Sequence, residues 1–190
     1  MLQTCLVQTD AELSQIFNLN QRNLKQHLSE AERSSQGFVT WLYEPPLLRQ
    51  MHQLAPSVIV KDGDIVAGYA LVTLLAFAAF HPDLAAMFRY LAPLQYRQRP
   101  LLEHKFYCMG QVCIEKAYRG KGIFDMLYAG HRRYYASRFD LLVTEISTSN
   151  CRSQRAHEKT GFTTISTYRD HIDEWNVVVW DWKENNQNAR

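Results

Sequence analysis

The chain has 190 residues, a length expected for one domain with a single core, which we place over residues 1–190. Hydrophobic residues make up 46% and charged residues 21% of it, a balance that excludes an intrinsically disordered chain. The net charge of +2 is too small to indicate a nucleic-acid partner. Basic residues gather locally at 131–133 and 152–155, which favours a small molecule that carries phosphate.

Cysteine usage and hydropathy indicate the compartment. The N-terminus shows no basic region followed by an apolar core, and the longest apolar run, 65–80, is shorter than the ~20 residues of a membrane helix. We therefore expect a cytoplasmic protein without a membrane partner. No Cys-x-x-Cys pair occurs among the four cysteines, which are Cys5, Cys108, Cys113 and Cys151.

The N-terminal segment predicts a strand and two helices. Residues 2–8 alternate weakly between apolar and polar and form a candidate strand. Asp10 follows as a candidate N-cap for a helix through Phe17. The polar region 19–35 predicts a second, exposed helix that ends before Gly37.

Aromatic side chains are concentrated in residues 38–43, directly before Pro45 and Pro46. The two prolines force an extended or turn conformation, after which residues 47–54 predict a short helix. The aromatic residues either line a pocket or pack in the core, and we favour packing.

Residues 57–61 and 65–75 are apolar runs joined by a turn that contains Gly63, which predicts an antiparallel hairpin. The second run is apolar on both parities, so we expect it inside the sheet with both faces covered. Residues 76–104 then break the pattern, with a helix that begins at Pro82. We interpret 76–104 as an insertion between the third and fourth strands, which covers a pocket, contacts a partner or packs against the sheet.

The second half of the chain alternates strands with helices. Residues after Lys183 are polar, and we expect them to fray. The expected elements are a strand at 105–114, a helix from 123 to about 137, a strand at 141–146, a helix from Asn150 to Thr160, and strands at 162–168 and 175–182.

Residues 111–124 read as a strand, a turn and a helix start. Gly120 and Gly122 allow backbone conformations and close approaches that a side chain would block. The first amides of a helix have no intrahelical acceptor, and with the helix dipole they form a site for phosphate. Arg119 and Lys121 add positive charge beside it.

Three short patterns in the chain are incomplete. Gly120-Lys121-Gly122 lacks the third glycine of a dinucleotide fingerprint and the Ser or Thr of a P-loop. His157-Glu158 is followed by Gly161 where a zinc-protease helix needs its second histidine. Lys159-Thr160-Gly161 has no Ser-x-x-Lys partner elsewhere in the chain. No metal site is expected.

Two blocks resemble the GCN5-related N-acetyltransferase (GNAT) superfamily, which transfers an acyl group from acyl-coenzyme A. Within residues 112–127, Tyr118-Arg119-Gly120-Lys121-Gly122-Ile123 is similar to the pyrophosphate loop Gln/Arg-x-x-Gly-x-Gly/Ala, although Ala117 occupies its first position. Residues 150–162 are similar to the family's Asn-x-x-Ala/Ser and Tyr-Glu-Lys-x-Gly-Phe helix. The blocks cover about a quarter of the chain, in the family's order.

The resemblance implies an α/β (α+β) fold with a mixed, mostly antiparallel sheet of about six to seven strands. Helices flank this sheet, which is splayed between strands 4 and 5, and the pantetheine of acetyl-CoA lies in the gap. Asn150 is also a plain helix cap, and both roles can hold at once. The implied cofactor contacts are Val112, Cys113, Ile114, Arg119, Gly120, Lys121, Gly122, Ile123, Phe124, Asn150 and Ser153.

The resemblance also suggests catalytic residues. His157 stands where many members carry a tyrosine that protonates the thiolate, with simple packing as an equal alternative. The amide near Cys113 is a candidate for stabilising the oxyanion. Glu145, Glu103 and His104 are candidates for the base, with a water relay as the other option.

The leading hypothesis is an N-acetyltransferase that moves acetyl from acetyl-CoA to a primary amine by direct attack in a ternary complex. The acceptor is a small molecule or an amino-acid-like substrate. The alternative is a non-catalytic acyl-CoA-binding module that recognises a protein partner. The acceptor, the acyl length and the oligomeric state, with a homodimer among the options, are left open by the sequence.

Overall fold

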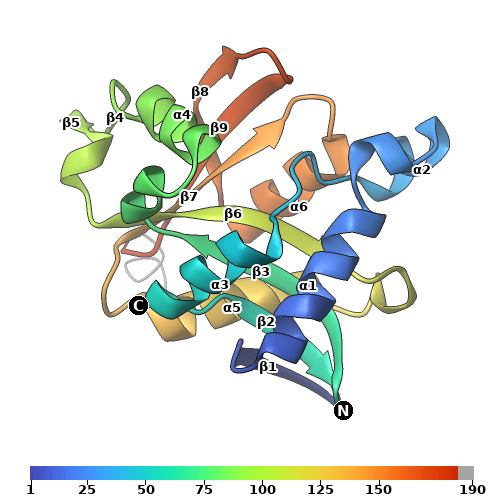
Figure 1. Cartoon of the computed structure of the whole chain (residues 1–190). Helices are drawn as coiled ribbons and strands as arrows, with labels where there is room; N and C mark the ends of the chain where they lie inside the picture. Colours follow the sequence, from blue (N-terminus) through green and yellow to red (C-terminus); the bar gives the residue numbers. More distant parts are fainter. Residues whose placement is uncertain (184–190) are drawn as a thin grey trace.

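A seven-stranded sheet forms the centre of the computed structural model, which describes residues 1–183 (Figure 1). The polar tail after Lys183 lies outside the described residues. Among the seven strands described in this sheet, β6 and β7 are the one parallel pair, so the predicted mixed, mostly antiparallel sheet is confirmed. In sheet order the strands are β1 (Leu2–Leu6), β2 (Val58–Asp62), β3 (Ile65–Thr73), β6 (Phe106–Ile114), β7 (Leu141–Ser147), β9 (Glu174–Asp181) and β8 (Thr163–Arg169).

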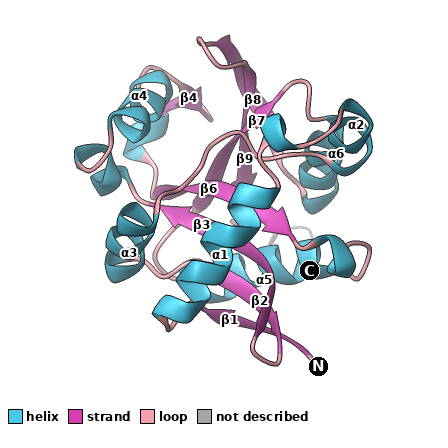
Figure 2. Ribbon diagram, turned by 45° about the vertical axis from the view of Figure 1, so that its right-hand side comes forward, coloured by secondary structure: helices cyan, strands magenta, loops and turns pink. Residues whose placement is uncertain are grey.

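Helices cover both faces of this sheet. In Figure 2, α1 crosses in front of β3 and β6, and α5 lies behind. The core is divided accordingly, with one apolar cluster under α1 and α3 and another under α5. Among residues 1–183 no helix is both long and apolar enough to cross a bilayer. The helices are α1 (Asp10–Arg22), α2 (Glu30–Gln36), α3 (Pro45–Leu54), α4 (Pro82–Leu91), α5 (Ile123–Tyr135) and α6 (Cys151–Thr160).

The start of α1 differs from the expectation. Thr9, not Asp10, is the N-cap: its side chain accepts from the Glu12 N–H, and Glu12 reaches back to the Thr9 N–H. This reciprocal capping box satisfies two amides that a single Asp cap would leave partly unpaired. The helix also continues to Arg22 instead of ending at Phe17, because its buried face extends to Leu19.

The hairpin β2–β3 is confirmed, and eight of the nine residues of β3 are buried. This strand lies inside the sheet, between β2 and β6. Both of its faces are covered, by α1 on one side and α5 on the other. The prediction made from its two apolar parities is therefore correct.

Residues 76–104 lie between β3 and β6, the third and fourth strands of the main sheet. Phe88 and Leu91 of α4 pack with Leu101 against β6, β7 and β9. The segment also contains a small hairpin, β4 (Gln95–Tyr96) and β5 (Arg99–Pro100), which the sequence did not predict. Its turn residues, Arg97 and Gln98, have φ of 50° and 62°, in the left-handed region where glycine or asparagine is the usual signal.

The parallel pair β6 and β7 separates part-way along its length. Pairing runs from Phe106↔Leu141 to Cys108↔Val143 and then stops. At Gly110 the chain packs tightly, because an added Cβ would lie 2.4 Å from Thr73 Oγ1 and 2.6 Å from the Tyr43 hydroxyl. The predicted splay between the fourth and fifth strands is confirmed, and it opens a gap into which the functional side chains project.

Candidate active site

Two hollows meet at the gap between β6 and β7. The first, which we call the loop groove, measures about 950 Å³ and lies between the 118–125 loop and α6. The second, which we call the inner pocket, measures about 180 Å³ and lies under α4 and the aromatic segment 38–43. Both hollows are lined by the same five residues at their junction, Phe38, Val39, Val112, Asn150 and Ser153.

The 118–125 loop presents backbone amides to the loop groove. Gly120 and Gly122 both have φ of 75°, and a Cβ at either position would meet nothing within 4 Å. Glycine is therefore favoured at both positions by the left-handed backbone conformation and not by a lack of space for a side chain. The first helical hydrogen bond of α5 joins Met126 N–H to Gly122 O, so the N–H groups of residues 123–125 have no helical acceptor. The predicted strand, turn and helix start are present, and their free N–H groups have the arrangement that suits an anion.

The two cationic side chains of this loop, Arg119 and Lys121, have contacts within the chain. The Arg119 guanidinium donates to Asn23 Oδ1 at 2.6 Å and also to Gln36 Oε1 and Ile114 O. The Arg119 N–H is bonded to Lys116 O, so this amide is not a free donor, whereas the guanidinium lines the groove and is held in place by its three acceptors. Lys121 Nζ lies 5.0 Å from the centre of the Tyr118 ring.

Positive charge also reaches the groove from α6. Arg152, Arg155 and Lys159 line the wall opposite the loop. Their spacing of three and four residues places them on one helix face. The sequence already indicated that the basic residues at 152–155 favour a ligand that carries phosphate. Only the fold shows that they lie opposite the glycine loop.

Backbone donors of β6 face the gap at alternate residues. Glu115 N–H bonds to Ala67 O on β3, and N–H directions alternate along a strand. The N–H of Cys113 therefore faces β3, and those of Val112 and Ile114 face the gap. The Cys113 thiol is 7% exposed and packs in the α1 cluster, where burial raises its pKa to about 12. Neither group of Cys113 is placed for chemistry in the gap.

Asn150 and Ser153 form the opposite side of the junction. The Asn150 Oδ1 atom accepts from the Ser153 N–H at 3.2 Å, which is the predicted N-cap of α6. The Asn150 Nδ2 atom donates to Phe38 O at 3.0 Å and so ties the aromatic segment to this helix. Asn150 therefore caps α6 and fixes the boundary between the two hollows.

His157 is 1% exposed and lies among Phe124, Tyr128 and Phe162. Its Nδ1 lies 2.8 Å from Ser153 O, a carbonyl that can only accept, so Nδ1 carries the proton. Nε2 then accepts from the Tyr128 hydroxyl. Burial lowers the pKa of His157 to about 4, which keeps the ring neutral. This arrangement favours packing over proton donation.

Glu145 of β7 lines the inner pocket, and its Oε1 atom is buried without a hydrogen-bond partner. Burial raises the pKa of this carboxyl to about 8; a hydrogen bond from Tyr168 opposes the rise, and the charge of Asp170 adds to it. Tyr168 is held by stacking on Tyr90 of α4, with ring centres 4.2 Å apart. A carboxylate with a pKa near neutrality in a cavity is suited to general-base catalysis.

The other two candidates for the base lie elsewhere. Glu103 is exposed and pairs with Arg99 at 3.8 Å. His104 Nε2 lies 3.0 Å from Tyr96 O, within the insertion. Neither residue lines the loop groove or the inner pocket.

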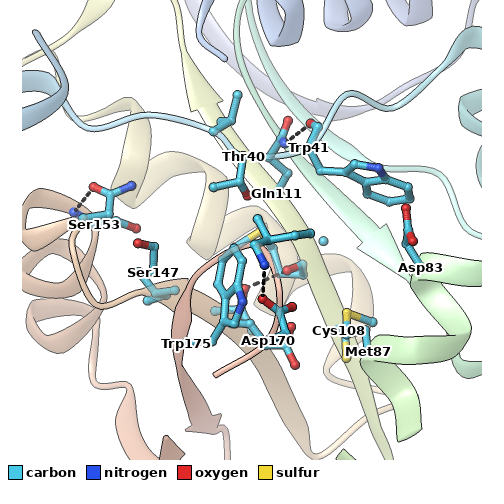
Figure 3. A pocket seen from close by; sticks show the side chains of 18 of the residues that line it. Thr40, Trp41, Asp83, Met87, Cys108, Gln111, Ser147, Ser153, Asp170 and Trp175 are labelled. Carbon is cyan, nitrogen blue, oxygen red and sulfur yellow. Dashed lines mark hydrogen bonds between the residues drawn. The ribbon is translucent and has the colours of Figure 1, made fainter. Parts of the chain in front are cut away.

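The aromatic segment lines the inner pocket through Phe38, Trp41 and Tyr43, so it serves a pocket as well as the core. Its position is set by two amides, since Gln111 Nε2 and Asn20 Nδ2 both donate to Trp41 O, at 2.8 and 3.0 Å. In Figure 3, Ser153 lies at one side of the pocket and Trp41 with Asp83 at the other.

Several pocket residues were missed by the sequence reasoning. Asp83 comes from α4, Asp170 from the turn between β8 and β9, and Trp175 from β9. The sequence showed them only as parts of a helix, a loop and a strand. No local spacing connects them, because the elements that carry them meet only in the folded chain.

No family model and no curated protein sequence matches the chain. Solved structures do match over nearly its whole length. A mosquito arylalkylamine N-acetyltransferase like 5b superposes with a TM-score of 0.66 and 15% identity, covering 95% of this chain and 100% of that one. The chain has the GNAT fold.

Two further GNAT-fold structures cover the chain to a similar extent. The ribosomal-protein-S18-alanine N-acetyltransferase from Escherichia coli has a TM-score of 0.64 and 11% identity, over 95% of this chain and 94% of that one. A chain of the NatC complex bound to Gag peptide and CoA has a TM-score of 0.63 and 14% identity, over 95% and 98%. Identities at this level show a shared fold, and the activity must be argued from the site.

Proposed function

We propose that this protein is an acetyl-CoA-dependent N-acetyltransferase that acts on a primary amine. The observation that carries the proposal is the junction of the two hollows: an anion-binding loop groove opens at the β6–β7 gap into a pocket that contains Glu145. The GNAT fold of the chain supports the same conclusion. NatC, one of the matched structures, is bound to CoA.

The donor set of the loop groove fits coenzyme A. Free N–H groups at residues 123–125 and the positive end of α5 would hold the pyrophosphate, and Arg155 and Lys159 add positive charge on the opposite wall. The N–H groups of Val112 and Ile114 would meet the amide-bearing arm, with Asn150 and Ser153 on its other side. Bound acetyl-CoA would supply the acetyl group as a thioester.

The base in this mechanism is Glu145. An amine enters the inner pocket as an ammonium ion, and the Glu145 carboxylate takes one proton from it. The neutral nitrogen then attacks the thioester carbonyl, where the N–H of Val112 or Ile114 can stabilise the oxyanion. When the C–N bond is complete, the C–S bond breaks, the nitrogen gives one of its two protons to the thiolate through water, and Glu145 releases its proton to solvent. We assign Val112 and Ile114 the role first considered for Cys113.

Acyl transfer through a protein thiol is disfavoured by the same geometry. Cys108 lines the inner pocket, but burial raises its pKa well above the ordinary value, and the thiolate is the nucleophilic form. Direct attack in a ternary complex therefore fits best. In this scheme His157 is a positioning residue that holds α6 against α5.

The matched structures do not fix the acceptor. Their names include an arylalkylamine N-acetyltransferase and an enzyme that acetylates the alanine of a ribosomal protein. The common feature in these names is the transfer of an acetyl group to an amine. We extend only this common feature to the present chain.

Isothermal titration with acetyl-CoA tests the loop groove. Gly122→Glu places a carboxylate at the amide cluster, and we expect binding to weaken by at least about 100-fold. Gly63→Glu is the matched control, because Gly63 has φ of 57° and open space around it but lies in the β2–β3 turn. Wild-type protein that does not bind acetyl-CoA, or equal affinity in all three proteins, would refute the proposal.

Product formation tests the chemistry separately. Acetyl-CoA and a library of primary amines are incubated with the protein, and acetylated products are measured by mass spectrometry. Tight binding without any acetylated amine would favour the non-catalytic acyl-CoA-binding module.

A further inference from the structure

The inner pocket has an aromatic wall assembled from four parts of the chain. Trp41 and Tyr43 come from the segment before α3, Tyr90 from α4, Tyr168 from β8 and Trp175 from β9. Figure 3 shows Trp41 at one side of the pocket and Trp175 near its middle. Such a wall favours an apolar or aromatic body, and aromatic faces also attract cations.

The charged side chains of the pocket are acidic. Asp83, Glu145 and Asp170 line it, together with His171 and the neutral His157, and none of its described lining residues is Lys or Arg. Two cations close to the 170–173 turn are already paired, Lys25 with Asp173 at 2.8 Å and Arg169 with Glu174 at 3.2 Å. A carboxylate on the acceptor would therefore lose its water and meet three carboxylates without a Lys or Arg partner.

Asp170 is held in its charged form at the centre of the pocket. Its Oδ1 atom accepts from the N–H groups of Ile172 and Asp173, at 2.8 and 2.9 Å. Burial alone would raise the pKa of Asp170, but these hydrogen bonds, together with the Trp175 side chain and the nearby His171, bring the pKa below its usual value. Asp170 is also close enough to raise the pKa of Glu145. An ammonium group near both carboxylates would be stabilised by the first and deprotonated by the second.

We propose that the acceptor is a compact monoamine with an aromatic body and no carboxylate, bound as an ammonium ion between Asp170 and Glu145. This inference rests on the proposed function. The pocket volume of about 180 Å³ is below the ~300–1,000 Å³ of common small-molecule sites, which selects against large acceptors.

Pairs of acceptors that differ by one group test the proposal. Tyramine and tyrosine differ by the carboxylate, and we expect kcat/KM for tyramine to exceed that for tyrosine by about 100-fold. Spermidine and a peptide with a free N-terminal alanine serve as the other acceptor classes. A result in which tyrosine, spermidine or the peptide is acetylated as well as tyramine overturns the inference but leaves the proposed function intact.

Variants locate the effect in the pocket. In Asp170→Asn the amide oxygen can still accept from Ile172 and Asp173, so the turn is retained while the charge is lost. We expect KM for tyramine to rise about 10-fold with unchanged affinity for acetyl-CoA. Met87→Lys adds a cation to the pocket lining. In this variant the ratio of kcat/KM for tyramine to kcat/KM for tyrosine should fall by about 10-fold. Asp64→Asn, on the exposed β2–β3 turn, is the control for a lost surface charge.

Calorimetry gives a readout that does not depend on turnover. Tyramine and tyrosine are titrated separately into protein saturated with CoA. We expect a heat of binding when tyramine is added and none when tyrosine is added. If the protein binds acetyl-CoA but neither tyramine nor tyrosine, the inference is wrong, whereas failure to bind acetyl-CoA would mean that the proposed function itself is wrong.

Discussion

The loop groove and the inner pocket are built from different parts of the chain. One wall of the groove is a continuous stretch, 118–125, whose contribution is backbone amides. The pocket is built from side chains on β6, β7, α4, β8, β9 and the aromatic segment. A backbone site tolerates most side-chain changes, because the donors are present in every residue except proline. A side-chain site depends on each residue, so single substitutions should act very differently in the two hollows.

The largest expected effect is on the rate when Glu145 is changed. Glu145→Gln keeps the shape of the side chain but removes the base, and we expect kcat to fall by about 10²- to 10⁴-fold. Because the base must be ionised, wild-type kcat/KM should rise with pH towards a plateau above about pH 8, the pKa of Glu145. Rate measurements from pH 6 to 10 check both effects. An unchanged pH profile in Glu145→Gln would assign proton removal to water.

Stability should change in the opposite direction in the same variant. The pKa of Glu145 is about 8 in the folded chain against an ordinary 4.5, so between these values the native state keeps a proton that the unfolded state has lost. Stability is therefore lost as pH rises through this range. We expect Glu145→Gln to be more stable than the wild type at pH 9, by roughly 3–4 kcal/mol, and similar at pH 4.5. Urea unfolding at the two pH values measures this difference.

His157 should matter more for folding than for chemistry. His157→Ala removes a ring packed against Phe162 and leaves the buried Tyr128 hydroxyl without its acceptor, which should lower the unfolding free energy by ~2–4 kcal/mol. The turnover of the folded fraction should change by less than about 3-fold. Thermal unfolding and kcat are compared in the same samples. A 100-fold loss of kcat at unchanged stability would instead support the acid role suggested by the family resemblance.

The pKa of His157 predicts how this contribution depends on pH. It is about 4 in the folded chain and 6.5 ordinarily, so the unfolded state binds the proton first as pH falls. The corresponding stability is present above pH 6.5 and is lost between pH 6.5 and 4.

The smallest effects are expected from side chains beside the loop groove. Lys121→Gln should leave affinity for acetyl-CoA within about 2-fold of the wild type, because Lys121 lies against Tyr118 and the loop binds through its amides. Arg155→Gln should weaken binding by several-fold at low salt and less at high salt, as expected for a partly screened charge. Titrations at two ionic strengths distinguish these outcomes. A large loss in Lys121→Gln would contradict a groove that binds through its backbone.

The sequence predicted the elements well where its signals are local. The β2–β3 hairpin, the glycine loop before α5 and the Asn150 cap of α6 each depend on residues a few positions apart. The β4–β5 hairpin was not predicted, because Arg97 and Gln98 adopt left-handed conformations without a glycine to signal them. The extent of α1 was also wrong, since its last turns are held by burial and not by a local stop signal.

By itself the sequence determined the strand, turn and helix start with their free amides, because glycine conformation and free helix amides follow from neighbouring residues. Only the tertiary structure decided which side chains meet at the proposed site. It bonded the Arg119 guanidinium to three acceptors within the chain, buried Cys113 and His157, and placed Glu145 in a cavity with Asp170. Whether a side chain is charged, buried or free depends on segments far away in the chain. The environment of each of these side chains therefore follows from the separation of β6 and β7 and from the segments that pack over the gap.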